Sequence, residues 1–381
     1  FRRIAYKLDH QAWVTALPNL GAEVKLADLP KFKLTDVVGD WLGWSPNGQA
    51  VTWTAGASFQ RYALEGEGIP ATPEDDEPKA DFIDPKLSRT PLGYSRPRAR
   101  PTSTLALTHA LVLPMDGGEP IEDATVVIDG DRIASVEPQG TPPPGAKVMD
   151  MTGKTIMPGL IDVHAHMHYG AADIVPDQPW AYLVNLDFGV TTVHDPSAST
   201  DVVFTQAERV EAGLSRGPRV FSTGFVLYGA LGNDNAETPD AEAAQRHVER
   251  LALAGAKSVK VYQQSRRDQR QWFVSACNAQ KVLCVAEGGG DLWMNLSMAA
   301  DGFHAIEHAL PNAPLYKDVR QFMAASRTES TLGTAYSPTL LVAYGGMSGE
   351  LYFYQHDGAY DDARLLRHWD RRDLDALTRR G

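Results

Sequence analysis

The sequence predicts an α/β protein: a (β/α)8 barrel that stops before its eighth strand, preceded by a small antiparallel β-sandwich and by the end of a β-propeller. Seven apolar strand-like runs alternate with amphipathic helical stretches from Thr155 on, and this favours a barrel over an open sheet. Strands separated by Asp-Gly turns precede them, and Trp-rich runs around a Pro-Asn-Gly turn lie within residues 36–64. The predicted domains are a propeller end (1–69), a linker (70–102), a β-sandwich (103–157) and the incomplete barrel (158–381).

Composition limits the classes of function. The chain has 381 residues, 43% of them hydrophobic, which is enough for two or three packed domains. Its net charge of -12 argues against a nucleic-acid partner or an anionic membrane surface. The two cysteines form no CxxC pattern, so neither a disulfide framework nor a thiolate zinc site is expected. We therefore expect a small-molecule or short-peptide substrate, whereas the oligomeric state is not predicted.

The N-terminal region has the pattern of antiparallel strands. An isolated two-stranded ribbon is marginal in water, and propellers solve this by repeating four-stranded blades. The stretch GWSPNGQAVTWTAG, Gly43–Gly56, resembles a blade of the TolB-like propellers. The chain begins with Phe1 rather than Met, which together with this blade suggests a fragment or a processed product. No apolar run approaches the ~18 residues of a membrane helix, and the N-terminus lacks the apolar core of a signal peptide.

Three histidines cluster in GLIDVHAHMH, Gly159–His168. Side chains at i and i+2 of a strand share a face, so His164 and His166 are expected to point into the barrel at the end of its first strand. Two imidazoles there would make half of a metal site. The alternative is a pair of solvent-facing loop histidines, and His168 is expected to be a loop residue or a hydrogen-bond donor to a ligand.

A lysine in SVKVYQQ is the next candidate. Lys260 faces the side opposite Val259 and Val261, so it should point into the barrel. Burial disfavours the charged amine, and a neutral lysine can react with carbon dioxide to give a carbamate that bridges two metal ions. The alternative is a simple ion pair with Glu287.

Two later strand ends supply further candidates. Glu287 ends the strand in VLCVAEGGG and can ligate a metal or act as a base. His308 in GFHAIEHAL is expected to be a ligand; strand alternation places it on the side of Ile306, with Glu307 facing the other way. His194 and Asp195, in TTVHDPS, could shape the pocket, although a turn-capping aspartate before proline explains Asp195 equally well.

Together, MPGLIDVHAHMH, the lysine of SVKVYQQ, AEGGG and IEH resemble the metal-dependent amidohydrolase superfamily, in particular its imidazolonepropionase-like branch, over residues 103–346. The resemblance implies that His164 and His166 bind metal, that Lys260 is carboxylated and that His308 is the ligand of strand six. In two respects the sequence departs from the family. Glu287 stands where the family usually has a histidine, and the strand-eight aspartate, which takes the proton of the attacking water, lies beyond this chain.

The resemblance also implies a chemistry. One or two divalent ions would lower the pKa of a bound water and polarise a carbonyl, so we expect hydrolysis of a C–N bond in an amide or cyclic amide. Nitrogen and oxygen ligands suit zinc, with iron or manganese as alternatives. Two other functions stay open: a one-metal deaminase with an uncarboxylated Lys260, and a catalytically silent, propeller-linked binding fragment.

Two further expectations follow from the resemblance. We expect the chain as it stands to be poorly active, because the predicted barrel is open and lacks its general base. A TolB-like propeller precedes the barrel in a subset of such enzymes, which favours a periplasmic or secreted location.

Overall fold

The computed structural model describes most of the chain in two compact units. One unit comprises Phe1–Ser95, Asp195–Phe204 and Phe221–Tyr354, and the other comprises Arg96–His194, Thr205–Val220 and Gln355–Gly381. Each unit is considered by itself. The described residues are 3–17, 25–26, 29–66, 69–70, 84–170, 174–229, 236–311, 314–326, 333–340 and 351–379.

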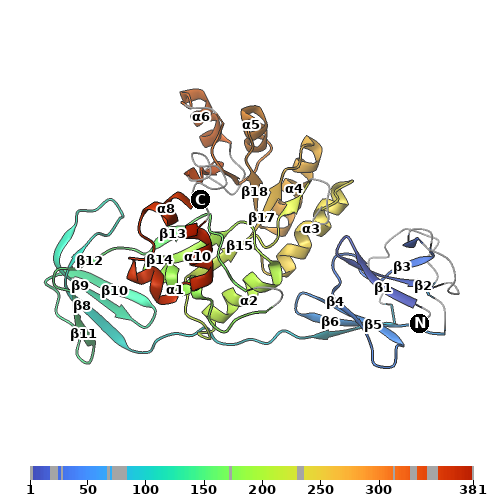
Figure 1. Cartoon of the computed structure of the whole chain (residues 1–381), viewed down its shortest axis with the longest axis horizontal. Coiled ribbons are helices and arrows are strands. Elements are labelled where there is room, and N and C mark those ends of the chain that lie inside the picture. The colour runs from blue at the N-terminus through green and yellow to red at the C-terminus, as the bar shows by residue number, and fades with distance from the viewer. Residues whose placement is uncertain are drawn as a thin grey trace. The chain divides into compact units, whose positions relative to one another are not determined.

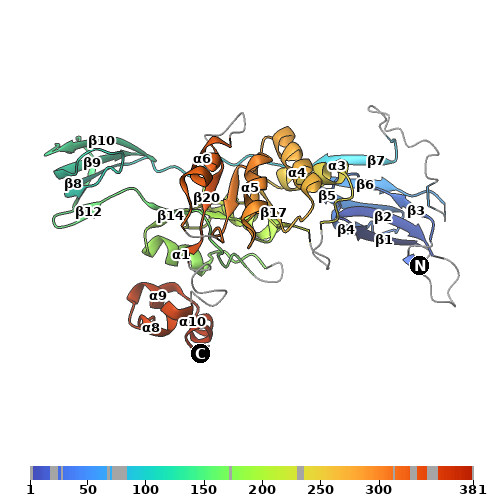
Figure 2. The same ribbon diagram turned by 90° about the horizontal axis from the view of Figure 1, so that it is seen from above.

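The N-terminal strands form two antiparallel sheets (Figure 2). Strands β1 (Arg3–Leu8), β2 (Gln11–Ala16) and β3 (Lys31–Lys33) form the first, and β4 (Asp40–Trp44), β5 (Ala50–Ala55), β6 (Ser58–Ala63) and β7 (Leu87–Pro91) form the second in that order. Alternating residues of these strands, among them Val14, Trp53 and Tyr62, are buried in one apolar cluster. Four strands is the number in a propeller blade, while the propeller itself stays a prediction.

The predicted linker needs a correction. Strand β7 lies inside residues 70–102 and pairs with β6, from Ser58 opposite Pro91 to Tyr62 opposite Leu87. Its sequence, LSRTP, has no apolar alternation that would reveal a strand, and the pairing instead satisfies the open edge of β6. Residues 71–83 of the predicted linker lie outside the described residues.

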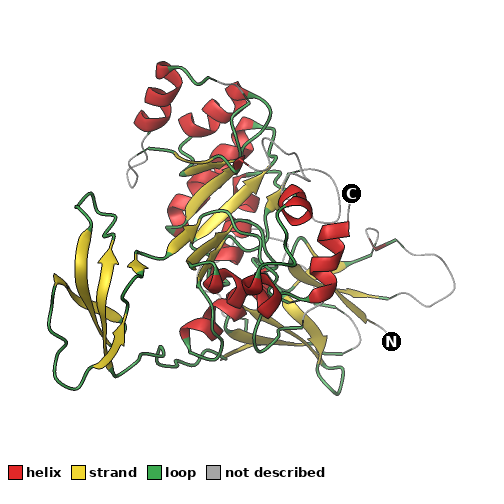
Figure 3. Ribbon diagram, turned by 60° about the vertical axis from the view of Figure 1, so that its left-hand side comes forward, coloured by secondary structure: helices red, strands yellow, loops and turns green. Residues whose placement is uncertain are grey.

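The region 103–157 forms one five-stranded sheet among the residues that the structure describes (Figure 3). Strands β8 (Thr104–Val112), β9 (Ile121–Asp129) and β10 (Arg132–Pro138) pair antiparallel, while β11 (Lys147–Asp150) and β12 (Thr155–Ile156) pair parallel with β8. The expectation of a purely antiparallel sheet is therefore wrong. The chain leaves the β10 edge and returns beside β8 in the same direction, which side-chain alternation alone does not encode. The second layer of a sandwich stays a prediction.

Two sheets follow, where the sequence predicts one barrel. The first contains β13 (Leu160–Asp162), β14 (Val190–Asp195) and β15 (Arg219–Ser222), and the second is a parallel sheet of β16 (Leu227–Tyr228), β17 (Ser258–Tyr262), β18 (Leu283–Glu287), β19 (Ala305–Glu307) and β20 (Ala335–Ser337). The described strands β13 to β20 form two separate sheets, so the closed barrel stays a prediction.

One predicted strand is divided between these sheets. The run RVFSTGFVLY, 219–228, contributes β15 and β16, and its middle turns at Gly224, whose φ of 65° is a left-handed conformation that suits glycine. The seventh predicted strand, YSPTLLVAY, overlaps β20, but its residues 341–344 lie outside the described residues.

Helices pack on one face of the parallel sheet formed by β16 to β20 (Figure 1). These are α3 (Ala241–Leu253), α4 (Arg267–Gln280), α5 (Leu292–Ala300) and α6 (Lys317–Ala325). They cover the alternate strand residues that point outward, which are Val259, Val261, Cys284, Ala286 and Ile306. The strand residues between them, which include Lys260, Glu287 and Glu307, point to the opposite face of the sheet.

Of the other described helices, three lie in the second unit: α1 (Trp180–Asp187), α9 (Ala363–His368) and α10 (Arg371–Arg379). Two more, α2 (Thr200–Glu211) and α8 (Leu351–His356), contain residues of both units. Arg367 pairs with Asp187 at 3.0 Å, and Trp369 packs on Trp180 with ring centroids 4.8 Å apart, so α9 is attached to α1. No helix within the described ranges has the length and apolar character needed to cross a membrane.

Candidate functional site

The register of three parallel strands places charged side chains on one face. Lys260 of β17 lies opposite Val285 of β18, and Glu287 lies opposite Glu307 of β19. Aligned residues of parallel strands face the same side, and so do residues two apart on one strand. Lys260, Glu287 and Glu307 therefore share the face of the sheet that points away from the helices, called the inner face below. Lys260 faces the side opposite to Val259 and Val261 as the sequence predicts, while a barrel interior on that side stays a prediction.

Lys260, Glu287 and His308 form a connected cluster, in which the first two side chains are buried and His308 is partly exposed. Lys260 Nζ lies 2.7 Å from Glu287 Oε2, and His308 Nε2 lies 3.0 Å from Glu287 Oε1. Lys260 is 2% exposed and Glu287 is 9% exposed. Each carboxylate oxygen thus has its own nitrogen partner in a region with little water, where removal of one partner would leave an uncompensated charge.

The surroundings of Glu287 stabilise its ionised form. Burial alone would raise the pKa of this carboxyl, but the hydrogen bond with His308 and the charge of Lys260 outweigh burial and lower the pKa. Glu287 is accordingly an anion at neutral pH. The ion pair with Lys260 is the alternative that the sequence left open, and carboxylation of Lys260 stays a prediction.

The imidazole of His308 faces this cluster, which is not the orientation that strand alternation predicts. Alternation puts His308 on the side of Ile306, which is buried in the helix-facing core. The residue follows the last residue of β19 and has a φ of 67°, so the chain turns and the imidazole faces Glu287 instead. The expectation for Glu307 is also wrong, because its register with Glu287 places it on the inner face, where it is 3% exposed.

Two tyrosines adjoin the cluster and were not singled out from the sequence. Tyr228 and Tyr262 are opposite each other on β16 and β17, and their rings stack with centroids 5.0 Å apart. Lys260 Nζ lies 5.4 Å from the centre of the Tyr262 ring. Burial first, and then the negative charge of Glu287, raise the pKa of Tyr262. Strand alternation already places Tyr262 on the face of Lys260, whereas the position of Tyr228 depends on the pairing of β16 with β17.

His164 and His166 lie side by side in the other unit. Their ring centroids are 5.1 Å apart, with ring planes at 82°. They follow β13 rather than lie on it, because the strand ends at Asp162, whose Oδ1 accepts the His164 backbone N–H at 3.0 Å in a turn. The predicted strand position is therefore wrong, although the two imidazoles remain adjacent. His166 is exposed.

The neighbouring candidates have structural contacts. His194 Nδ1 lies 3.2 Å from the Val163 carbonyl, and its own carbonyl accepts the Ala165 N–H at 2.9 Å, so His194 holds the histidine segment against β14. Asp195 is 1% exposed and accepts the Ser197 N–H at 2.9 Å, which is the turn-capping alternative. His168 stacks on Trp180.

The two groups of donors differ in what they could hold. Across the described ranges, no three His, Cys, Asp or Glu side chains lie close enough together to hold a metal ion. His164 and His166 supply two nitrogens, and Glu287 and His308 supply an oxygen and a nitrogen, in separate units. Convergence of the two groups stays a prediction, and so does metal binding by any of them.

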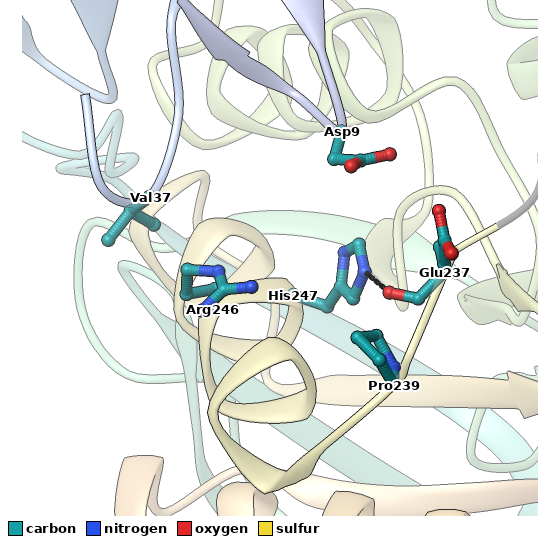
Figure 4. A pocket seen from close by; sticks show the side chains of 6 residues that line it. All are labelled: Asp9, Val37, Glu237, Pro239, Arg246 and His247. Carbon is teal, nitrogen blue, oxygen red and sulfur yellow. Dashed lines mark hydrogen bonds between the residues drawn. The ribbon is translucent and has the colours of Figure 1, made fainter. Parts of the chain in front are cut away.

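A pocket of about 250 Å³ lies elsewhere in the first unit (Figure 4). The His247 Nε2 lies 3.0 Å from the Glu237 carbonyl, and the His10 ring packs edge-on against His247 at 6.1 Å. The pocket holds none of the predicted site residues, and its lining consists of Asp9, Val37, Glu237, Pro239, Arg246 and His247. We therefore locate the candidate chemistry at the strand ends rather than in this pocket.

Comparison with known proteins identifies similar enzymes. No family model matches the chain. An adenine deaminase of Serratia proteamaculans (strain 568) is 33% identical over 113 residues, which is 30% of this chain and 18% of that protein. An imidazolonepropionase of Streptomyces griseus is 37% identical over 73 residues, 17% of this chain and 19% of that protein. The matches thus span less than a fifth of the length of each of these curated relatives.

Solved structures show the same fold more broadly. A Xaa-Pro dipeptidase with bound methionine in its active site matches 72% of this chain and 73% of its own, with a TM-score of 0.51 and 16% identity. At that identity the likeness concerns the fold, a mixed α/β architecture found in amidohydrolases. The chain is thus similar to enzymes of the amidohydrolase superfamily, which act on C–N bonds.

Proposed function

We propose that the chain belongs to a metal-dependent hydrolase that cleaves a C–N bond of an amide or cyclic amide by attack of activated water. The observation that carries the proposal is the cluster of Lys260 within β17, Glu287 at the end of β18 and His308 just after β19, in which the lysine and the glutamate are buried. Active sites of α/β barrels lie at this end of the strands. The similarity to amidohydrolase-superfamily enzymes supports the same class of reaction.

The donor chemistry fits a divalent ion. The proposed ligands are His164, His166, Lys260, Glu287 and His308, which offer imidazole nitrogen and carboxylate oxygen, and a carbamate if Lys260 is carboxylated. Such donors suit zinc, with iron or manganese as alternatives, in a centre of one or two ions. A bound ion would supply an acidified water and a Lewis acid for the carbonyl. The membership of all five residues in one centre rests on the sequence resemblance.

The chain's own residues have distinct tasks in this proposal. Glu287 is ionised and held from both sides, so in this proposal it offers a fixed carboxylate as a ligand for the metal ion. His308 Nε2 stabilises the carboxylate and fixes its direction. The stacked Tyr228 and Tyr262 form an aromatic wall beside it, which would exclude water from one side of a bound substrate.

A mononuclear deaminase is the second candidate. The observation in its favour is the 2.7 Å contact of Lys260 with Glu287, because a lysine that stays an ammonium ion cannot bridge two metals. The similarity to an adenine deaminase supports the same candidate. A silent, propeller-linked binding fragment is the third, and it predicts no turnover at all.

The remaining proposals concern the whole protein. We propose a propeller end over 1–69 and a β-sandwich over 103–157 before the barrel residues, a small-molecule or short-peptide substrate, and a periplasmic or secreted location. The last of these has support only from the sequence resemblance to TolB-like propellers.

A substrate panel tests the function. N-acyl amino acids, dipeptides, cyclic ureas and adenine are incubated with zinc-loaded and chelator-treated protein. We expect release of an amine from an amide or cyclic amide that is lost when the metal is removed. Ammonia released from adenine would favour the deaminase. No turnover of any of these substrates would favour the silent fragment, and turnover that is unchanged by the chelator would contradict metal dependence.

A further inference from the structure

The loop that follows Glu287 is held by one buried side chain. Asn295 of α5 is 0% exposed, and its amide makes two hydrogen bonds with the same residue. Its Oδ1 accepts the Gly289 N–H, and its Nδ2 donates to the Gly289 carbonyl, both at 2.9 Å. Both polar groups of the Gly289 backbone are thus satisfied by one side chain, which fixes the orientation of the peptide planes on either side of that residue.

The same loop is also tied to the strand that leads to His308. Gly288 N–H donates to the Glu307 carbonyl at 3.0 Å. A side chain at Gly288 would place its Cβ 2.1 Å from that oxygen, so only glycine allows this approach. The loop therefore connects Glu287 on one side with the residue before His308 on the other.

We propose that Asn295 is a positioning residue, which holds the Glu287 carboxylate between Lys260 and His308 through the Gly288–Gly289 backbone. The proposal rests on the proposed function of that cluster. Both contacts of Glu287, at 2.7 and 3.0 Å, depend on where β18 ends, and the loop beyond it is held by Asn295 alone among the side-chain bonds that the structure describes for Gly288 and Gly289.

The amide is chemically required for this task. An aspartate has the same shape but, when ionised, accepts hydrogen bonds without donating any, so it repels the Gly289 carbonyl. Once protonated, a carboxyl again offers one donor and one acceptor. Asn295→Asp should therefore regain the wild-type contact as the pH falls, whereas Asn295→Ala should not.

Three variants test the proposal on the whole chain: Asn295→Ala, Asn295→Asp and Thr334→Val. Thr334 is a matched control, because it is 8% exposed and its hydroxyl donates to the Phe303 carbonyl at 3.1 Å, before β19 and β20 begin. That bond lies at the opposite end of the sheet. Thr334→Val thus reports the effect of losing a buried hydrogen bond alone.

We expect Asn295→Ala to lower zinc affinity and kcat by about 10- to 100-fold, the range typical of residues that orient metal ligands, with little change in KM. Amide hydrogen exchange over residues 288–291 should become faster in this variant and not in Thr334→Val. The activity of Asn295→Asp relative to the unaltered protein should rise as the pH falls.

One result would contradict the role proposed for Asn295. If Asn295→Ala keeps zinc affinity and kcat within about threefold while losing only as much stability as Thr334→Val, Asn295 is a packing residue and the proposal is wrong. If the unaltered protein turns over no substrate, the proposed function fails by itself. Zinc affinity and hydrogen exchange then still decide whether Asn295 positions Glu287.

Discussion

The two groups of candidate ligands occupy opposite environments. Lys260 and Glu287 lie on adjacent central strands and are almost fully buried, so their charges are satisfied by each other and by His308. His164 and His166 follow a three-residue strand whose residues are all exposed. A buried charge must be compensated for the chain to fold, whereas an exposed imidazole is already solvated. We therefore expect variants of the first group to change stability more than variants of the second.

The largest expected change in unfolding free energy comes from removing a charge of the buried group. Lys260→Met removes the cation and leaves Glu287 buried without it, which should cost about 3–5 kcal/mol of unfolding free energy in metal-free protein. The double variant Lys260→Met/Glu287→Gln removes both charges and should recover most of that loss. Urea unfolding measures both. A loss below about 1 kcal/mol in the single variant would show that the pair is not compensating a buried charge.

The next effect concerns the backbone beside the buried group. Gly288→Ala places a methyl group 2.1 Å from the Glu307 carbonyl oxygen, and relieving that clash should cost about 1–3 kcal/mol. Gly290→Ala is the control, because a Cβ there meets nothing within 4 Å, and it should change stability by less than about 0.5 kcal/mol. Equal unfolding midpoints for the two variants would contradict the close approach of β18 and β19.

A pH titration extends the comparison to other histidines. Burial first, then the charges of Arg250, His247 and Lys7, lower the pKa of His10 to about 3. The unfolded chain takes up this proton below about pH 6.5, but the folded chain resists it until about pH 3, so stability is present above 6.5 and declines as the pH falls. Between about pH 6.5 and pH 3, the loss of unfolding free energy due to His10 should approach about 1.4 kcal/mol per pH unit.

His10→Gln should flatten that slope, measured as urea midpoints between pH 7 and 4.5. His109→Gln is the exposed counterpart, since Asp123 hydrogen-bonds its ring and raises its pKa, the opposite direction. If His10→Gln and the unaltered protein lose stability at the same rate on acidification, His10 is not buried as a neutral imidazole.

The smallest expected effect on stability belongs to His164, which is partly exposed, and His166, which is exposed. His164→Ala and His166→Ala should each change the unfolding free energy of metal-free protein by less than about 0.5 kcal/mol. Both should nevertheless lose zinc and metal-dependent turnover. Undiminished zinc binding would contradict the proposal that they are metal ligands, and a large loss of stability would contradict their smaller role in the fold.

Strand periodicity predicted the buried group better than the turns around it. The alternation of SVKVY shows which side Lys260 faces, because Val259 and Val261 pack under the helices. The position of His308 depends instead on one left-handed residue after a strand, and non-glycine residues enter that conformation too rarely to be predicted from sequence. The inward position of Glu307 depends on register with β18, which is a property of two strands together.

The fold shows the same division between local and long-range information. The βα units follow from apolar periodicity, and the hairpin of β4 and β5 follows from the Pro46-Asn47-Gly48 turn between two Trp- and Val-containing runs. Strand β7 and the parallel edge formed by β11 depend on which edge a distant segment reaches, so local pattern could not reveal them. The break between β15 and β16 is marked only by Gly224, a residue that is equally compatible with a continuous strand.

The most direct test of the central claim is the number of divalent ions bound per chain, measured by elemental analysis of zinc-saturated protein before and after Lys260→Ala. If Lys260 is carboxylated and bridges two ions, as proposed, the unaltered protein should bind two ions and the variant fewer, with short carboxylic acids partly restoring activity. One ion in the unaltered protein, or two retained in the variant, would show that Lys260 is only the counter-ion of Glu287.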